Sequence, residues 1–366
     1  MGGWHHCVVF RVMISCRCRG ATTFYASSDW TRTTPKMENG QSVVTTVAPA
    51  PNLIALIEEA CNRIYGLVRQ TPVARLPPDS RIPATTRAYA KLEQLQVTGS
   101  FKLRGATNKI MGLAPEAASA GVVTSSTGNH GLAVAAAAKY RGIDAEVYLS
   151  SQVPESKWKK IESFGARIQM IGQNPLDAEI AARAAAGKSG RTYVSPYNDW
   201  QVIAGQGTIG VELAHQIESV DAVFIATGGG GLISGVGTYL RERSPRTEIV
   251  GCWPENSRVL YECLRAGKII EFPESQTLSE STAGGVEPGS ITFESARAVM
   301  HRGVLVPESA ILEAMKWARD RNWTIEGAAG VALAAFFQDA ERYEGKNVVV
   351  LFCGGNLSPE VLSRMQ

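Results

Sequence analysis

Hydrophobic and polar positions alternate with two different periods along the chain after residue 50. Apolar residues recur every three or four positions between Leu53 and Ile64, which is the period of one helix face. Farther along, short apolar runs rich in β-branched residues are each followed by an Ala-rich or amphipathic stretch. The predicted strands are 122–123, 145–149 and 167–171, and the predicted helices that follow them are 132–140, 157–164 and 175–186.

Three more apolar runs have the composition of buried strands, and each is followed by a loop that contains Gly, Pro or Asn. These runs are 221–226, 248–252 and 348–352. Because strands alternate with helices, the pattern predicts an α/β fold with a mainly parallel sheet. In such folds ligands bind beyond the carboxyl ends of the strands, so we expect the functional residues in those loops.

Composition and charge narrow the function classes. Hydrophobic residues make up 45% of the chain and charged residues 19%, which is typical of a folded globular protein. The 37 Lys and Arg residues against 34 Asp and Glu give +3, too even a balance to attract nucleic acid by net charge. No apolar stretch approaches the roughly 20 residues that span a bilayer. Seven scattered cysteines favour reduced thiols over a disulfide framework. We therefore expect neither a nucleic-acid nor a membrane partner.

Residues 1–48 differ in composition from the rest of the chain. No acidic residue precedes Asp29, whereas arginines are interspersed with Ser and Thr. This composition is typical of an organelle transit peptide. The alternative is a disordered tail, or an artefact of an assigned start upstream of a true translation start at Met37. In either case we expect the segment to add nothing to the fold. The protein would act in the cytoplasm, or in mitochondria or plastids if the segment directs import.

The first candidate loop is a run of glycines between the predicted strand 221–226 and an apolar helix start. With no side chains in the way, several N–H groups at a helix N-terminus can converge on an anion, so we expect a phosphate there. A dinucleotide fingerprint fails because Ser234 stands where its third glycine belongs, and the chain has no P-loop. The phosphate is therefore expected to belong to a small cofactor. The run comprises Gly228, Gly229, Gly230 and Gly231.

Three other loops carry candidate functional groups. Lys102 lies in Ser-Phe-Lys-Leu-Arg-Gly-Ala at an apparent helix start. A lysine that is desolvated and near other positive groups has a lowered pKa, and its free amine can form a Schiff base. Asn129 lies in Ser-Thr-Gly-Asn-His-Gly, where N–H groups and hydroxyls suit a carboxylate. Cys353 ends the last predicted strand, where it could lie beside a heterocycle or simply be buried.

Together with Val-Ile-Ala-Gly-Gln-Gly-Thr at 202–208, these loops resemble those of fold type II pyridoxal phosphate enzymes, within the threonine and serine dehydratase (ammonia-lyase) and serine racemase branch. The likeness covers about residues 51–363. It implies two open, mainly parallel, twisted sheets flanked by helices, as in the tryptophan synthase β-like fold, with the cofactor in a cleft between two domains. The large domain would comprise 49–118 and 199–366, and the small one 119–198. We expect a homodimer or another homo-oligomer.

The resemblance also implies residue roles. Lys102 would carry pyridoxal 5'-phosphate, Phe101 would lie against its ring, and Asn129 would meet its 3-hydroxyl. Cys353 would face the pyridine nitrogen, and Glu326 would lie at the cofactor's edge, unless it is only an acid at a helix N-terminus. The phosphate would lie on Gly228, Gly229, Gly230, Gly231 and Leu232. The substrate carboxylate would be surrounded by Ser126, Thr127, Gly128 and His130.

The residue expected at the pyridine nitrogen and one departure from the family pattern narrow the expected reaction. A neutral Cys353 thiol leaves the ring less electron-withdrawing, which favours prompt β-elimination over a long-lived carbanion. L-Threonine would give 2-oxobutanoate, L-serine would give pyruvate, and both would release ammonia. Gly284 stands where relatives often carry Asp, which leaves room for a substrate bulkier than serine.

Three alternatives to a dehydratase stay open. The first is a serine racemase or a dual racemase and dehydratase. Thr127 stands where racemases place a serine that moves a proton, and Thr127 would then be a second catalytic residue. Trp253 and Val259 stand where racemases have acidic metal ligands, so no metal site is expected. The second is a β-replacement synthase, and the third is a cofactor-binding protein without turnover.

Overall fold

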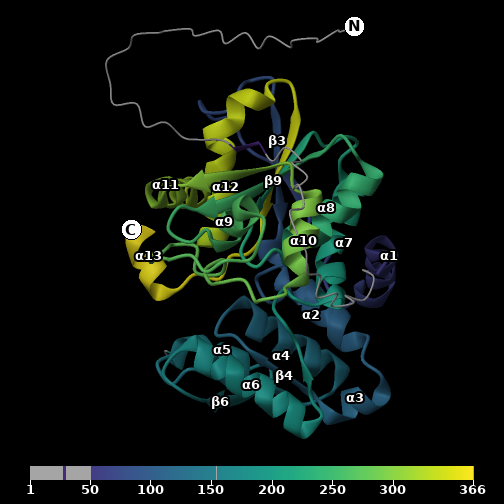
Figure 1. Ribbon diagram of the computed structural model, residues 1–366. Coiled ribbons are helices and arrows are strands. Elements are labelled where there is room, and N and C mark those ends of the chain that lie inside the picture. The colour runs from purple at the N-terminus through teal and green to yellow at the C-terminus, as the bar shows by residue number, and fades with distance from the viewer. Residues whose placement is uncertain (1–27, 30–50, 154, 366) are drawn as a thin grey trace, which may run out of the picture.

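The computed structural model describes residues 28–29, 51–153 and 155–365 and contains two β-sheets (Figure 1). The seven-stranded sheet has the order β1-β10-β9-β8-β11-β3-β2, with β1 and β2 antiparallel at its two edges and the other strands parallel. The four-stranded sheet, β6-β5-β4-β7, is entirely parallel. The strands are β1 (Ser28–Asp29), β2 (Val73–Arg75), β3 (Arg87–Leu92), β4 (Val122–Ser125), β5 (Ala145–Leu149), β6 (Arg167–Met170), β7 (Thr192–Tyr193), β8 (Ala222–Ala226), β9 (Glu248–Pro254), β10 (Arg302–Val306) and β11 (Asn347–Phe352).

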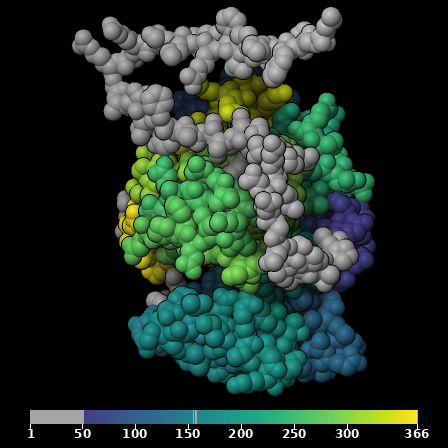
Figure 2. Space-filling model, in the orientation of Figure 1, coloured from purple at the N-terminus to yellow at the C-terminus, as the bar shows by residue number. Residues whose placement is uncertain are grey.

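Helices cover both sheets, and the two sheets with their helices form distinct masses. In the space-filling view the blue and teal residues around the four-stranded sheet lie below the green and yellow residues (Figure 2). The helices are α1 (Leu53–Ile64), α2 (Lys102–Met111), α3 (Pro115–Ala120), α4 (Asn129–Arg141), α5 (Glu155–Glu162), α6 (Pro175–Ser189), α7 (Trp200–Gln216), α8 (Gly231–Arg243), α9 (Val259–Ala266), α10 (Ile291–Val299), α11 (Glu308–Arg319), α12 (Gly327–Asp339) and α13 (Pro359–Met365), with short 3₁₀ turns η1 (Glu93–Leu95) and η2 (Ala340–Tyr343).

The central strands are buried on both faces because helices pack on each side of the seven-stranded sheet. Every residue of β8 and of β11 is buried, as expected for parallel strands with helices on both faces. On one face, α12 packs across these strands, and the ring of Phe336 meets that of Phe224 edge-on at 5.6 Å between centroids. This burial fixes the register of β8 and β11, and with it the positions of the loops at their carboxyl ends.

Helix α2 lies between the two sheets and begins at Lys102. On one side α2 packs on α4, which in turn contacts β4 and β5 of the four-stranded sheet. On the other side α2 packs on α1 and α7. The approach of α2 to α7 is close because Gly105 and Gly205 face each other: a Cβ on Gly205 would lie 2.6 Å from the Gly105 Cα. The first turn of α2 is therefore held from both sides.

The structure confirms the α/β fold class, the two mainly parallel sheets and most predicted elements. Helix α1 and strand β5 have the predicted bounds, and β4 extends two residues beyond its predicted end to Ser125. One expectation is wrong. Ser28 and Asp29, in the segment expected to add nothing, form an edge strand that pairs with Gly303 and Arg302. The rest of residues 1–48 lies outside the described residues, and the division into domains stays a prediction.

Across the residues described here, none of the helices combines the length and apolar composition that crossing a bilayer requires.

Candidate active site

A cavity of about 1080 Å³ lies at the carboxyl ends of strands from both sheets. The segments that follow β4, β8 and β11 all contribute to its wall, as the α/β pattern predicts. All the site residues nominated from the sequence line this cavity. They are Phe101, Lys102, Ser126, Thr127, Gly128, Asn129, His130, Gly228, Gly229, Gly230, Gly231, Leu232, Glu326 and Cys353.

Lys102 presents its amine to the cavity from the first residue of α2. Its Nζ donates a hydrogen bond to the carbonyl oxygen of Pro196 at 2.8 Å. Burial lowers the pKa of Lys102 to about 8, although the nearby Cys353 and Glu326 act in the opposite direction. The expectation that positive neighbours contribute to this lowering is therefore wrong, and desolvation alone accounts for it. A substantial fraction of the amine is neutral at slightly alkaline pH and available as a nucleophile.

Cys353 holds the residue before Lys102 in place. The backbone N–H of Phe101 donates to the Cys353 carbonyl oxygen at 3.0 Å, which ties the start of α2 to the end of β11. Burial, with the nearby Glu326, raises the pKa of the Cys353 thiol well above its ordinary value. The thiol is therefore protonated and neutral, and it can offer only a weak hydrogen bond.

The glycine loop between β8 and α8 forms a cradle of backbone N–H groups. Gly230 has φ +86°, in the left-handed region that glycine tolerates best. A Cβ on Gly229 would lie 2.6 Å from the ring of Tyr197, so only glycine fits there without displacing that ring. Helix α8 has no side-chain cap, which leaves the N–H groups of its first turn free for an anion.

The loop after β4 leads into α4, whose first N–H groups also lack a side-chain cap. Ser126 and Thr127 are partly buried here, and the Ser126 Oγ accepts a hydrogen bond from the Gly128 N–H at 3.3 Å. Uncapped N–H groups and two hydroxyls at the start of a helix suit a carboxylate.

His130 lines the cavity but cannot donate to a carboxylate there. Its Nε2 lies 2.9 Å from the Val194 carbonyl oxygen, which only accepts, so Nε2 carries the ring hydrogen. Burial, with the nearby Lys102, lowers the pKa of His130 to about 3, so the ring is neutral. His130 thus shapes the wall, and a carboxylate bound there would need other donors.

Asn129 and Glu326 are hydrogen-bonded to each other inside the cavity. The Asn129 Nδ2 lies 3.0 and 2.8 Å from the two Glu326 carboxylate oxygens, and Ser281 Oγ donates to Glu326 Oε1 at 2.7 Å. Glu326 is the N-cap residue of α12, but its side chain makes no capping hydrogen bond. Burial raises the pKa of Glu326. The structure therefore places this carboxylate in the cavity wall as well as at a helix N-terminus.

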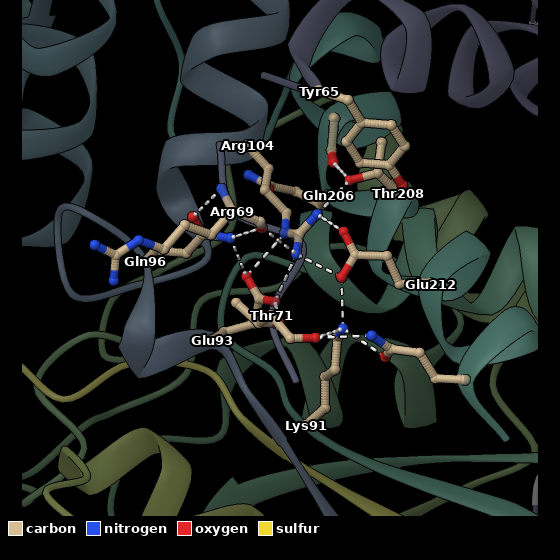
Figure 3. Close-up of polar contacts among 12 residues, drawn as sticks. Tyr65, Arg69, Thr71, Lys91, Glu93, Gln96, Arg104, Gln206, Thr208 and Glu212 are labelled. Carbon is tan, nitrogen blue, oxygen red and sulfur yellow. Dashed lines mark hydrogen bonds and ion pairs between the residues drawn. The ribbon is translucent and has the colours of Figure 1, made fainter. Parts of the chain in front are cut away.

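Behind α2, away from the cavity, a buried network of charges holds Arg104 (Figure 3). Arg104 pairs with Glu93 at 2.7 Å and with Glu212 at 2.5 Å, and Lys91 pairs with Glu212 at 2.5 Å. All four side chains are at most 3% exposed. The network joins β3, η1, α2 and α7, and so anchors the turn that begins at Lys102.

Several residues of the site have no role in the sequence-based hypothesis. Asn356 stands three residues after Cys353, behind two glycines, and this spacing was the only signal for it. Tyr197 and Pro196 come from the loop after β7, and nothing in their spacing indicated a role. Trp253 and Val259, the residues at the racemase metal positions, are 1% and 4% exposed in the core. Within the described ranges, no three His, Cys, Asp or Glu side chains gather into a group that could hold a metal ion.

The chain is similar to known proteins along most of its length. It is 37% identical over 305 residues to the catabolic L-threonine dehydratase TdcB of Staphylococcus aureus (strain N315), an alignment that covers 82% of this chain and 88% of that protein. Maize serine racemase superposes with a TM-score of 0.78 and 31% identity, covering 85% of this chain and 95% of that one. A processed threonine deaminase from Solanum lycopersicum superposes with a TM-score of 0.80 and 28% identity, covering 91% and 98%. Residues 64–354 match the family described as "Pyridoxal-phosphate dependent enzyme". The lysine, the glycine cradle and these similarities together establish that the chain belongs to the pyridoxal-phosphate dependent enzyme family.

Proposed function

We propose that this enzyme removes the β-hydroxyl and amino groups of L-threonine and L-serine, giving 2-oxobutanoate or pyruvate and ammonia. The observation that carries the proposal is the desolvated Lys102 amine, which shares one cavity with the glycine cradle and with the loop at 126–130. The similarity to proteins named threonine dehydratase and threonine deaminase supports the choice of substrate.

The cavity fits the cofactor. The uncapped N-terminus of α8 and the glycine loop would hold the phosphate, and Lys102 Nζ would attach the cofactor through its aldehyde. Phe101 and Asn129 line the same cavity and would contact the ring. When bound, the cofactor supplies an electron sink for the bonds at the substrate's α-carbon.

The proposed work of the protein is to hold the substrate and to move protons. N–H groups and hydroxyls at 126–130 hold the carboxylate, with His130 limited to shaping the wall. Lys102 Nζ, free of the cofactor once the substrate is bound, would take the proton from the α-carbon. Its pKa of about 8 suits this task near neutral pH. Cys353 stays neutral, and for that reason we favour elimination of the β-hydroxyl over racemisation.

We propose that the β-carbon of the substrate would lie beside Gly284, where there is room for the threonine methyl group. Gly284 lines the cavity with φ +120°, and no atom lies within 4 Å of where its Cβ would be. Relatives that carry Asp at this position would place a charged side chain there.

Gly229→Ala tests the glycine cradle. The new methyl would press on the Tyr197 ring, whose hydroxyl accepts a hydrogen bond from the Glu287 N–H at 3.1 Å, so the loop must shift. We expect pyridoxal phosphate to bind about tenfold more weakly or worse, equal to ~1.4 kcal/mol. Absorbance titration of the apoprotein measures this affinity. Gly187→Ala, in open space on α6, is the control and should bind normally; unchanged binding by Gly229→Ala would mean that the phosphate lies elsewhere.

A racemase is the second candidate, favoured by the similarity to maize serine racemase. Thr127 is the discriminating residue, because a β-branched side chain restricts the rotamers from which its hydroxyl could pass a proton. We expect Thr127→Ser to raise racemisation relative to elimination about tenfold, equivalent to ~1.4 kcal/mol between the two barriers. Chiral chromatography of the amino acid and a keto-acid assay give the ratio. Thr124→Ser is the control. The Thr124 hydroxyl donates to the Val194 carbonyl oxygen outside the cavity, so this variant should leave the ratio of racemisation to elimination unchanged.

A panel of amino acids screened for ammonia and keto acid tests the proposed function directly. We expect both products from threonine and serine without any added thiol. Formation of the D-amino acid without keto acid would favour a racemase. Dependence on sulfide or a thiol would favour a β-replacement synthase, and no turnover with any amino acid would leave only cofactor binding.

We also propose that the enzyme is a homodimer or another homo-oligomer and acts in the cytoplasm. Import into an organelle is the alternative if residues 1–48 act as a transit peptide. Light scattering on the purified holoenzyme would give the mass of the assembly. Fluorescent fusions of the full chain and of the chain without residues 1–48 would differ in location only if that segment directs import.

A further inference from the structure

We propose that Asn356 is a positioning residue that turns the N–H side of the Asn129 amide toward the cofactor cavity. Asn356 follows β11 and lines the cavity. Its Nδ2 donates to the Asn129 Oδ1 at 2.7 Å and to the Thr98 carbonyl oxygen at 2.8 Å. Its Oδ1 accepts from Lys160 Nζ at 2.8 Å.

The partners of Asn356 fix which way its own amide faces. An amide side chain keeps nearly the same shape when it is turned by half a rotation, so only its neighbours decide where the oxygen lies. Thr98 offers a carbonyl oxygen, which only accepts, and Lys160 offers an ammonium, which only donates. Turning Asn356 would break both hydrogen bonds. Its Nδ2 must therefore face Thr98 and Asn129.

The orientation of Asn129 follows from that of Asn356. A donor from Asn356 meets one end of the Asn129 amide, so this end must be the oxygen. The other end is the nitrogen, and it lies against the carboxylate of Glu326, which accepts at 2.8 and 3.0 Å. The Asn356 nitrogen can only donate, and the Glu326 carboxylate can only accept while it is ionised. Together these two groups fix both ends of the Asn129 amide.

The chain of hydrogen bonds links the two sheets. Lys160 in α5 and Asn129 in α4 belong to the layer of the four-stranded sheet, and Asn356 and Glu326 to the other layer. Asn356 reaches between them because Gly99 leaves room: a Cβ there would lie 2.8 Å from the Asn356 Oδ1. Asn356 and Asn129 are 227 residues apart, so no local sequence rule sets this contact.

The N–H group that Asn129 presents to the cavity would affect the ionisation of the cofactor. The inference rests on the proposed placement of Asn129 beside the cofactor's 3-oxygen, but not on the choice of substrate. An N–H donor stabilises the deprotonated form of that oxygen, and an amide oxygen in its place would repel it. Asn356 would thereby influence the affinity for the cofactor and the pH at which its absorbance changes.

Asn356→Asp is the test, because it keeps the size of the side chain and replaces the donor by an acceptor. With a carboxylate on each side, the Asn129 amide is no longer held with its nitrogen toward the cavity, and its turned form presents the oxygen there. We expect the dissociation constant of pyridoxal phosphate to rise about tenfold. The pH midpoint of the bound cofactor's absorbance should move upward. Both are measured without any amino acid, so a failure of the proposed dehydratase activity would leave this result readable.

Asn347→Asp is the matched control at the opposite end of β11. Asn347 is buried, donates to Ser219 O at 2.9 Å and accepts from Arg87 Nε at 2.6 Å, but does not line the cavity. We expect it to lower the melting temperature of the apoprotein and to leave cofactor affinity and absorbance unchanged. An equal effect of the two variants on the cofactor would overturn the proposal.

The double variant Asn356→Asp with Glu326→Gln separates orientation from packing. The glutamine amide that Glu326→Gln introduces can donate to the turned Asn129 oxygen, which rebuilds the hydrogen bonds between these side chains with donors and acceptors exchanged. We expect the melting temperature of this apoprotein to rise above that of Asn356→Asp alone, while cofactor affinity and the pH midpoint stay altered. If the double variant regains both cofactor properties, or if Asn356→Asp never loses them, the orientation of Asn129 does not matter and the inference fails.

Discussion

Lys102→Met should reduce keto-acid release by about 10⁴-fold or more, because one substitution removes both the nucleophile and the base. The absorbance of covalently held pyridoxal phosphate should disappear as well. The same substitution should stabilise the apoprotein, since burial disfavours the wild-type ammonium. Among the described residues no carboxylate accepts a hydrogen bond from its Nζ, which donates to the Pro196 carbonyl oxygen. Loss of activity with a gain in stability is typical of a functional residue in a strained or desolvated position.

The stability gain of Lys102→Met has a defined pH dependence. The pKa of Lys102 is lowered in the folded chain to about 8 from its ordinary value of 10.5. Below about pH 8 both the folded and unfolded wild-type chains carry the proton, so the folded state bears the full penalty and the variant has its largest advantage. Between these two values only the unfolded chain keeps the proton, so wild-type stability rises with pH and the difference shrinks. Urea unfolding of both apoproteins at several pH values measures it.

Lys109→Met is the control for Lys102→Met. Lys109 lies on the same helix but pairs with Asp199 at 2.7 Å and does not line the cavity. It should keep turnover and the cofactor absorbance. Retention of either property by Lys102→Met would contradict the role assigned to this lysine.

Arg104→Met should cost about 3–5 kcal/mol of the free energy of unfolding, because it leaves Glu93 buried without its cation and Glu212 with Lys91 alone. Glu93 and Glu212 are 0% and 3% exposed and hold the guanidinium from two sides (Figure 3). Lys91 also pairs with Glu212, but it lies on β3 and does not replace the guanidinium at Glu93. Denaturant unfolding of the apoprotein, read as a shift in midpoint at constant slope, measures the loss.

Arg302→Met provides the matched comparison for Arg104→Met. Arg302 is 1% exposed and pairs with Glu248 and Asp339, but these partners are 26% and 19% exposed. Their carboxylates can reach water once the arginine is gone, so the expected loss is clearly smaller than at Arg104. Equal losses would show that the burial of the partners does not set the size of the effect.

Features of this protein that depend on residues close together in the sequence could be predicted from the sequence. Strands β8 and β11 are apolar throughout because parallel strands are covered on both faces, and this pattern appears in any short window. The glycine run was equally clear, since four successive glycines stand between an apolar strand and a helix start. Since the loops at the carboxyl ends of such strands converge, the sequence also indicated which loops line the cavity, and the family resemblance supplied the individual residues.

Only the tertiary structure decided which of these residues touch one another and in what protonation state. The lowered pKa of Lys102 arises from burial and not from positive neighbours. The hydrogen on His130 is fixed by the Val194 carbonyl oxygen, 64 residues away. The Asn129 amide is set by Asn356, and Arg104 meets Glu212 across 108 residues. Desolvation and donor direction depend on atoms that distant segments bring together, and no local period or spacing in the sequence encodes them.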